Sequence, residues 1–269
     1  MTTLKIDNRT ARWLWLAQQG LGETPTGPLD LAGMIRDLGF VQLDTIQVVA
    51  RAHHHILWSR NQNYREPMLD RLLARDRAVF EHFTHDASVI PMEFLPMWRR
   101  QFDRMRDYYG RAGWVKGLPG PEDRARIKAR ITEEGPLSTQ DFDTRIEGDK
   151  AMWRRPPHKL ALDYMWYAGE LATCHRVNFT KVYDLAERVF PAELREERLS
   201  EAQQIDWLCH GALDRMGFGT PGDVQRFWDA VTRGEAGAWA EAAALVPVEI
   251  EGADGTWAKA LAPADFETR

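Results

Sequence analysis

Apolar residues recur at helical spacing near the start of the chain. The amphipathic pattern from Asn8 to Gln18 predicts a helix, and the glycine- and proline-rich stretch from Gly20 to Pro28 predicts the loop that follows it. A second amphipathic pattern predicts a helix from Leu29 to Leu38. Gly39 is expected to end this helix, because glycine readily adopts the left-handed backbone conformation that closes many helices.

The segment from Phe40 to Ile46 has a different period. Its apolar and polar residues alternate, and strict alternation is typical of a strand with one buried face. Val41 and Leu43 would lie on one side of this strand, and Gln42 and Asp44 on the other. The pattern therefore predicts two polar side chains that point the same way beside apolar support.

The middle of the chain combines helix and hairpin signals. A short helix is expected to start at Ser138 or Thr139, and a longer one to run from Pro157 to Ala168. Two strands, Glu170 to Arg176 and Lys181 to Leu185, are predicted to follow as a hairpin. The order of short helix, longer helix and hairpin is typical of a winged helix, a common DNA-binding unit.

A similar order returns in the last third of the chain. Thr220 is followed by a pattern that opens a helix, and the ranges Leu245 to Ile250 and Trp257 to Leu261 predict a second hairpin. The repetition is one of architecture and not of residue identity.

These patterns together predict an α+β fold that is mainly helical and built from tandem winged-helix domains, each a helix-turn-helix with a β-hairpin. The first expected domain carries the Gln42-x-Asp44 segment and a helical extension. The predicted domains cover residues 1–120, 121–192 and 193–269.

Length and composition agree with a globular protein. The chain has 269 residues, of which 44% are hydrophobic, so it can bury sizeable cores. It has no apolar run of the roughly 18 residues that a membrane span needs, and no secretory signal at its start. We therefore expect a cytoplasmic protein without a membrane partner. Its two cysteines, Cys174 and Cys209, lack the spacing of a zinc site, and a disulfide framework would need more of them.

The charge is unevenly distributed. The net charge of −5 argues mildly against a polyanionic partner, yet residues 99–131 contain ten basic and four acidic residues. Most basic residues of the chain are arginine, whose planar fork suits bidentate contact with phosphate. This stretch is either a nucleic-acid contact or a solvated helix face, and charge alone favours neither.

Two neighbouring segments closely resemble the YcaQ family of bacterial DNA glycosylases. They are GFVQLDTI from Gly39 to Ile46 and RAHHHILWSR from Arg51 to Arg60. The resemblance extends over most of the chain, because FEHFTHDAS from Phe80 to Ser88 and the ranges 157–171 and 178–191 also fit this family.

The resemblance implies tandem winged helices around a DNA channel, excision of N7-alkylated purines and unhooking of interstrand crosslinks. It implies a monomer that acts on damaged duplex DNA without a cofactor. The catalytic signature of the family is Gln, an apolar residue, then an acid or amide, which corresponds here to Gln42, Leu43 and Asp44. Members of the family usually continue into a carboxy-terminal β domain, which we expect to be absent from the sequence that ends at Arg269.

The chemistry of Gln42 and Asp44 is consistent with a DNA glycosylase. A purine alkylated at N7 is already cationic, so its glycosidic bond breaks without a strong general acid. Asp44 would stabilise the oxocarbenium-like sugar and activate water, and Gln42 would orient the water or the nucleotide. Because no lysine lies near this motif to form a Schiff base, we expect simple hydrolysis without strand cleavage. Taken alone, a Gln-x-Asp tripeptide is more often a surface pair.

Three adjacent histidines, His53, His54 and His55, could suggest a metal site. The side chains of adjacent residues on a helix point about 100° apart, however, so three in a row cannot converge on one ion. We therefore expect no metal site, and assign these histidines and the basic residues beside them to DNA. A second basic group stands at the start of the helix predicted from Pro157. The expected DNA-binding residues are Arg51, His53, His54, His55, Arg60, Arg154, Arg155 and Lys159.

Two other functions remain open. Winged helices serve most often in transcriptional regulators, which bind one operator sequence and have no catalytic activity. A protein-interaction scaffold would show no DNA affinity at all. A pair such as Gln42 and Asp44, aimed together into a DNA channel, distinguishes a glycosylase from both alternatives.

Overall fold

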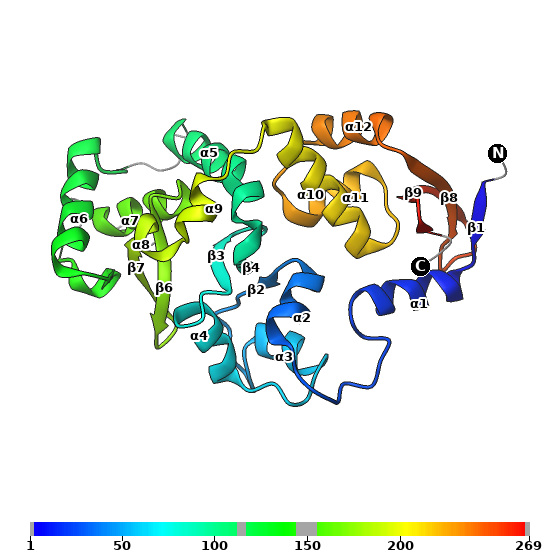
Figure 1. The fold of residues 1–269 in the computed structure, drawn as a ribbon, viewed down its shortest axis with the longest axis horizontal. Helices are drawn as coiled ribbons and strands as arrows, with labels where there is room; N and C mark the ends of the chain where they lie inside the picture. Colours follow the sequence, from blue (N-terminus) through cyan, green and yellow to red (C-terminus); the bar gives the residue numbers. More distant parts are fainter. Residues whose placement is uncertain (1–2, 112–116, 144–154, 267–269) are drawn as a thin grey trace. The chain divides into compact units, whose positions relative to one another are not determined.

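A computed structural model describes residues 3–111, 117–143 and 155–266 of the chain. The fold is α+β, as the sequence predicts, but it is about half helical where a mainly helical fold was expected. Figure 1 shows the helices, which are α1 (Asn8–Gln18), α2 (Leu31–Leu38), α3 (Ala52–Trp58), α4 (Glu66–Ala74), α5 (Leu95–Arg111), α6 (Pro121–Glu134), α7 (Pro157–Tyr167), α8 (Ala186–Val189), α9 (Ala192–Glu196), α10 (Glu201–Met216), α11 (Pro221–Trp228) and α12 (Arg233–Ala242). The described residues also include the 3-10 turns η1 (Met92–Phe94) and η2 (Thr139–Asp141).

The strands form three small sheets of three strands each within the described ranges. Their orders are β1-β8-β9, β2-β4-β3 and β5-β7-β6. The strands are β1 (Leu4–Ile6), β2 (Val41–Gln42), β3 (Val79–Phe83), β4 (Ala87–Pro91), β5 (Leu137–Ser138), β6 (Leu171–Val177), β7 (Thr180–Leu185), β8 (Leu245–Glu251) and β9 (Trp257–Pro263). The two predicted hairpins are confirmed as β6–β7 and β8–β9, both antiparallel.

The chain divides into two compact units. The first unit consists of Met1–Glu66, Thr84–Pro91 and Leu199–Arg269, and the second of Pro67–Phe83 and Met92–Arg198. These units are defined by packing, whereas the predicted domains were defined by the order of helices and hairpins. The division into residues 1–120, 121–192 and 193–269 therefore stays a prediction.

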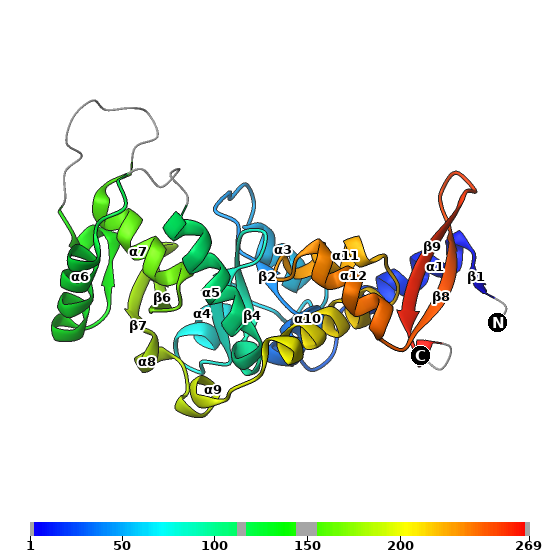
Figure 2. The same ribbon diagram turned by 90° about the horizontal axis from the view of Figure 1, so that it is seen from above.

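In the first unit, the two ends of the chain share a sheet. β1 pairs in parallel with β8, so that Leu4 lies opposite Val248, and Figure 2 shows β1 and α1 beside the β8–β9 hairpin. A small core forms where Ile6, Ala11 and Ala262 are buried together with Val248. The sequence analysis did not find β1, because a strand of three residues has too short a pattern to be recognised without its distant partner.

Helix α2 and the residue after it position β2 in the first unit. Asp30 caps α2 by accepting a hydrogen bond from the Gly33 amide, which explains why the helix begins two residues later than predicted. Gly39 ends α2 as expected, with a φ of 87°. A Cβ at Gly39 would lie 2.6 Å from Cη2 of the buried Trp228, so only glycine fits here without displacing its neighbours.

The second unit contains the β5-β7-β6 sheet with α6 and α7. Its core includes the fully buried Trp98 and Trp166. α7 runs from Pro157 to Tyr167, close to the predicted range. The predicted helix at Ser138 is only the 3-10 turn η2, because the Ser138–Asp141 capping box closes one turn and Phe142 is already extended.

Among the described residues, no helix is long and apolar enough to cross a membrane.

Candidate active site

The predicted alternation around Gln42 is confirmed. Val41 is 1% exposed and Leu43 7% exposed, whereas Gln42 is exposed and Asp44 is half-buried. β2 is only two residues long, and it pairs antiparallel with β4 so that Gln42 lies opposite Ser88. The Leu43 amide also donates to the carbonyl oxygen of Ala87 at 2.7 Å. The two apolar anchors and the pairing with β4 therefore fix the backbone that presents Gln42 and Asp44.

Asp44 is held on two sides by local hydrogen bonds. Its amide donates to Nδ1 of His53 at 3.2 Å, and its Oδ1 accepts from the Ile46 amide at 2.8 Å. The second carboxylate oxygen, Oδ2, accepts no hydrogen bond from any described residue. The carboxylate is thus oriented by one oxygen and leaves the other available to a substrate or water.

The segment between β2 and α3 is a loop, and helix begins again only at Ala52. A bridge between Gln47 and Arg51 closes the loop, and Arg51 precedes α3 in an extended conformation. At the tip, the side chains of Val48 and Val49 are 90% and 85% exposed. These two apolar side chains stand four and five residues after Asp44.

The three histidines of α3 differ in their surroundings, although the rings of His53 and His54 lie close together, with centroids 4.2 Å apart. His53 is buried against the Asp44 backbone, and His55 is exposed. His54 is half-buried, with Nδ1 at 2.8 Å from the Tyr64 hydroxyl and Nε2 at 3.5 Å from Glu66. The described part of the chain contains no group of three or more His, Cys, Asp or Glu residues that could hold a metal ion.

Arg60 makes structural contacts in the first unit. Its Nε donates to the carbonyl oxygen of Gln19 at 2.7 Å, and its Nη1 donates to that of Ile56 at 2.8 Å. Burial lowers the pKa of Arg60 from its ordinary value. The guanidinium therefore joins the ends of α1 and α3, and its assignment to DNA stays a prediction.

The other predicted DNA-binding residues belong to the second unit. Arg155 is exposed and forms an ion pair with Asp163, and Lys159 is half-buried in the first turn of α7. Arg154 lies outside the described residues. The structure brings Gln42, Asp44 and the residues of α3 together in one unit, and it places Arg155 and Lys159 in the other.

One buried charged cluster in the second unit was missed from the sequence. The side chain of Glu81 is fully buried, and its carboxylate accepts hydrogen bonds from Arg176 at 2.6 and 2.9 Å, with Lys181 at 3.4 Å. Burial raises the pKa of Glu81, but the charges of Lys181 and Arg176 outweigh burial and hold the pKa below its ordinary value. The cluster connects the β6–β7 hairpin to β3. Its residues are about a hundred positions apart in the chain, so no local sequence pattern predicts the contact.

Comparisons with known proteins identify one family and one similar fold. A sequence profile described as "DNA glycosylase AlkZ-like" matches residues 35–268, which include every described candidate residue above. The fold is also similar to that of Streptomyces sahachiroi DNA glycosylase AlkZ, with a TM-score of 0.69 and 14% sequence identity. That match covers 98% of this chain and 72% of the other.

Proposed function

The chain belongs to the AlkZ-like DNA glycosylase family, and from this premise we propose that it hydrolyses the N-glycosidic bond of N7-alkylated purines in duplex DNA and unhooks interstrand crosslinks. The observation that carries this proposal is the presentation of Gln42 and Asp44 on the open side of β2, with their backbone held by β4 and His53.

In this proposal, Asp44 stabilises the positive charge that develops on the sugar as the bond to the cationic base breaks. Its Oδ2 is the oxygen that faces the sugar or accepts a proton from the attacking water, because Oδ1 is already engaged by the Ile46 amide. Gln42 can both donate and accept hydrogen bonds, so it orients the water or the lesion nucleotide. The reaction is hydrolysis, with no covalent bond to the enzyme.

We further infer that the three sheets belong to winged-helix domains. In β2-β4-β3 and in β5-β7-β6, the first strand of the chain pairs with the third, and helices lie between the first and second strands. This is the arrangement of a winged helix, in which the hairpin forms the wing. In the β1-β8-β9 sheet, an isolated antiparallel bridge between Gly219 and Leu261 makes a related contact on β9.

A crosslinked purine is tethered to the opposite strand and cannot be fully extruded from the duplex. The exposed position of Gln42 supports an open site that reaches the lesion in place. A DNA complex with a flipped base in a deep pocket beside Asp44 would contradict this part of the proposal.

The test uses a duplex with one N7-methylguanine and measures base release. We expect Asp44→Asn to lower the rate by roughly a hundredfold, the scale of a positioned acid–base group. Asp37→Asn is the matched control, because Asp37 is an exposed aspartate of the same unit and its replacement removes the same charge. A second duplex with an N7-linked interstrand crosslink tests unhooking separately.

The alternative function is a regulator without catalytic activity. It predicts no base release by the wild type, together with a strong preference for one undamaged operator sequence over others. Equal loss of base release in Asp44→Asn and Asp37→Asn would also contradict the assigned role of Asp44.

A further inference from the structure

The second unit contains a pocket of about 400 Å³ that the proposed reaction does not use. It lies between α5, α6, the residues that follow α7, α8, and α9 with the segment after it. Five basic and three acidic side chains line it, so it carries an excess of positive charge. Two of the acids are neutralised, since Asp103 pairs with Arg106 at 2.6 Å and Glu170 with Lys128 at 3.5 Å.

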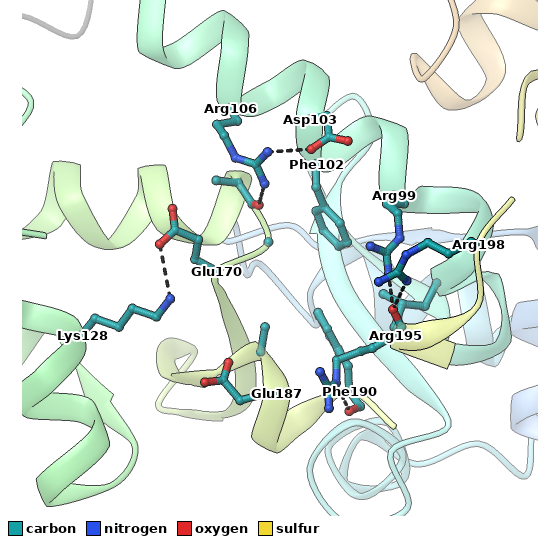
Figure 3. A pocket seen from close by; sticks show the side chains of 14 residues that line it. Arg99, Phe102, Asp103, Arg106, Lys128, Glu170, Glu187, Phe190, Arg195 and Arg198 are labelled. Carbon is teal, nitrogen blue, oxygen red and sulfur yellow. Dashed lines mark hydrogen bonds and ion pairs between the residues drawn. The ribbon is translucent and has the colours of Figure 1, made fainter. Parts of the chain in front are cut away.

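The other three basic residues form an arginine cluster, which consists of Arg99, Arg195 and Arg198. Figure 3 shows the guanidinium groups of Arg99 and Arg198 side by side at the carbonyl oxygen of Arg195. The distance from Arg198 Nη1 to this oxygen is 2.6 Å, and Arg195 Nε donates to the carbonyl oxygen of Phe190 at 3.1 Å. Backbone oxygens thus hold all three guanidinium groups in place.

This arginine cluster is not neutralised within the described part of the chain. None of its three members forms an ion pair with a described carboxylate, and each retains N–H groups beyond those that donate to backbone oxygens. Burial, and then the charge of Arg198, lower the pKa of Arg99 from its ordinary value. Three guanidinium groups gathered on one pocket repel one another, and an anion between them would relieve the repulsion.

Aromatic rings form another wall of the pocket. The rings of Phe102 and Phe190 are stacked, with centroids 6.2 Å apart and planes at 21°. Phe102 packs directly on the backbone of Gly169, where a Cβ would lie 2.7 Å from the ring. The pocket therefore offers fixed cationic donors beside a rigid apolar wall.

We propose that the arginine cluster binds a phosphate group, either from the DNA backbone or from a free nucleotide. The guanidinium fork matches the oxygens of a phosphate in bidentate geometry, and an array of positioned arginines is a typical phosphate site. The DNA source rests on the proposed function, whereas the nucleotide source does not.

The first experiment compares thermal unfolding of the full chain with deoxyguanosine 5′-monophosphate and with deoxyguanosine, at equal ionic strength. The variants are Arg99→Gln and Arg198→Gln. Arg111→Gln is the matched control, because Arg111 lies at the exposed end of the same helix as Arg99 and outside the pocket. Stabilisation by the nucleotide but not the nucleoside, lost in both variants and kept in the control, supports a nucleotide site.

The second experiment measures the affinity for an undamaged duplex as a function of salt concentration. If the cluster contacts the DNA backbone, each variant weakens binding by about tenfold at low salt and makes the slope of log K against log salt shallower by about one. The control leaves both values unchanged. Neither measurement uses base release, so failure of the glycosylase proposal is seen separately in the Asp44 assay.

The proposal is overturned if Arg99→Gln and Arg198→Gln behave as Arg111→Gln does in both experiments. Circular dichroism of all three variants checks that they fold. Arg198 is exposed and follows α9, so its replacement keeps the test valid even if Arg99→Gln destabilises α5.

Discussion

At the scale of single residues, the candidate site depends on a side chain that contacts the backbone of Asp44. His53 is 2% exposed, and its Nδ1 accepts the amide hydrogen of Asp44. It is therefore a positioning residue for the carboxylate, because it fixes the backbone from which that side chain extends.

We expect His53→Phe to lower the rate of base release by at least tenfold and the free energy of unfolding by about 1–3 kcal/mol, because it leaves the Asp44 amide without an acceptor. His53→Asn should restore much of the rate, since its side-chain oxygen can occupy the place of Nδ1. Single-turnover kinetics and denaturant unfolding measure the two effects. Base release by His53→Phe equal to that of His53→Asn would refute the positioning role.

A second residue-scale prediction concerns His82 in the second unit. Its Nδ1 accepts a hydrogen bond from Trp98 Nε1 at 2.9 Å, and its Nε2 lies 3.2 Å from the Tyr167 carbonyl oxygen. Burial lowers the pKa of His82 to about 3 from an ordinary value of 6.5. The native side chain is therefore neutral, with its proton on Nε2.

Between pH 6.5 and 3, the unfolded chain binds a proton at His82 that the folded chain does not. The free energy of unfolding should therefore fall as the pH falls, by up to about 1.4 kcal/mol per pH unit for this residue. Burial also lowers the pKa of His158, which acts in the same direction. We expect denaturant unfolding of His82→Gln between pH 7 and 5 to show a shallower dependence than the wild type. Parallel curves would refute the assignment.

At the scale of secondary-structure elements, the turn after α2 determines where β2 starts. Gly39 combines a positive φ with close contact to Trp228. We expect Gly39→Ala to lower the free energy of unfolding by about 2–4 kcal/mol, through backbone strain and overpacking together. Chemical denaturation measures this loss.

Gly27→Ala provides the control for Gly39→Ala. Gly27 has a φ of 101°, and no atom lies within 4 Å of a Cβ placed there. Its replacement therefore reports the cost of backbone strain without overpacking. An equal loss in the two variants would show that contact with Trp228 contributes nothing.

At the scale of the whole molecule, the net charge is divided unequally between the two units. The first unit has 12 basic and 19 acidic residues, whereas the second has 23 and 21. Positive charge is thus concentrated in the second unit, where Lys159, Arg155 and the arginine cluster lie.

We expect duplex binding by the full chain to weaken steeply with salt despite the net charge of −5. Lys159→Gln should make the slope of log K against log salt shallower by about one if Lys159 contacts a phosphate. Arg233→Gln, which removes an exposed charge from the first unit, should leave the slope unchanged. Fluorescence anisotropy at several salt concentrations measures both, and equal slopes for the two variants would contradict the role of Lys159.

The local pattern of apolar and polar residues determined many of the secondary-structure elements of this protein. The range of α1, the stop at Gly39, the β6–β7 and β8–β9 hairpins, and the opposite faces of Val41 and Gln42 were all predicted, because they depend on residues within a few positions of each other. The family was also recognised from sequence, since its motif is contiguous.

Only the tertiary structure decided which of these residues meet. The contact of His53 with the Asp44 amide, the pairing of β1 with β8, the burial of Glu81 beside Arg176 and the arginine cluster each join segments that are separated along the chain. Such contacts are selected by packing, because burying a charge or pairing a short strand is favourable only when a distant partner is already in place. The sequence alone could therefore identify the catalytic candidates, while the groups that hold them and the phosphate pocket emerged only from the fold.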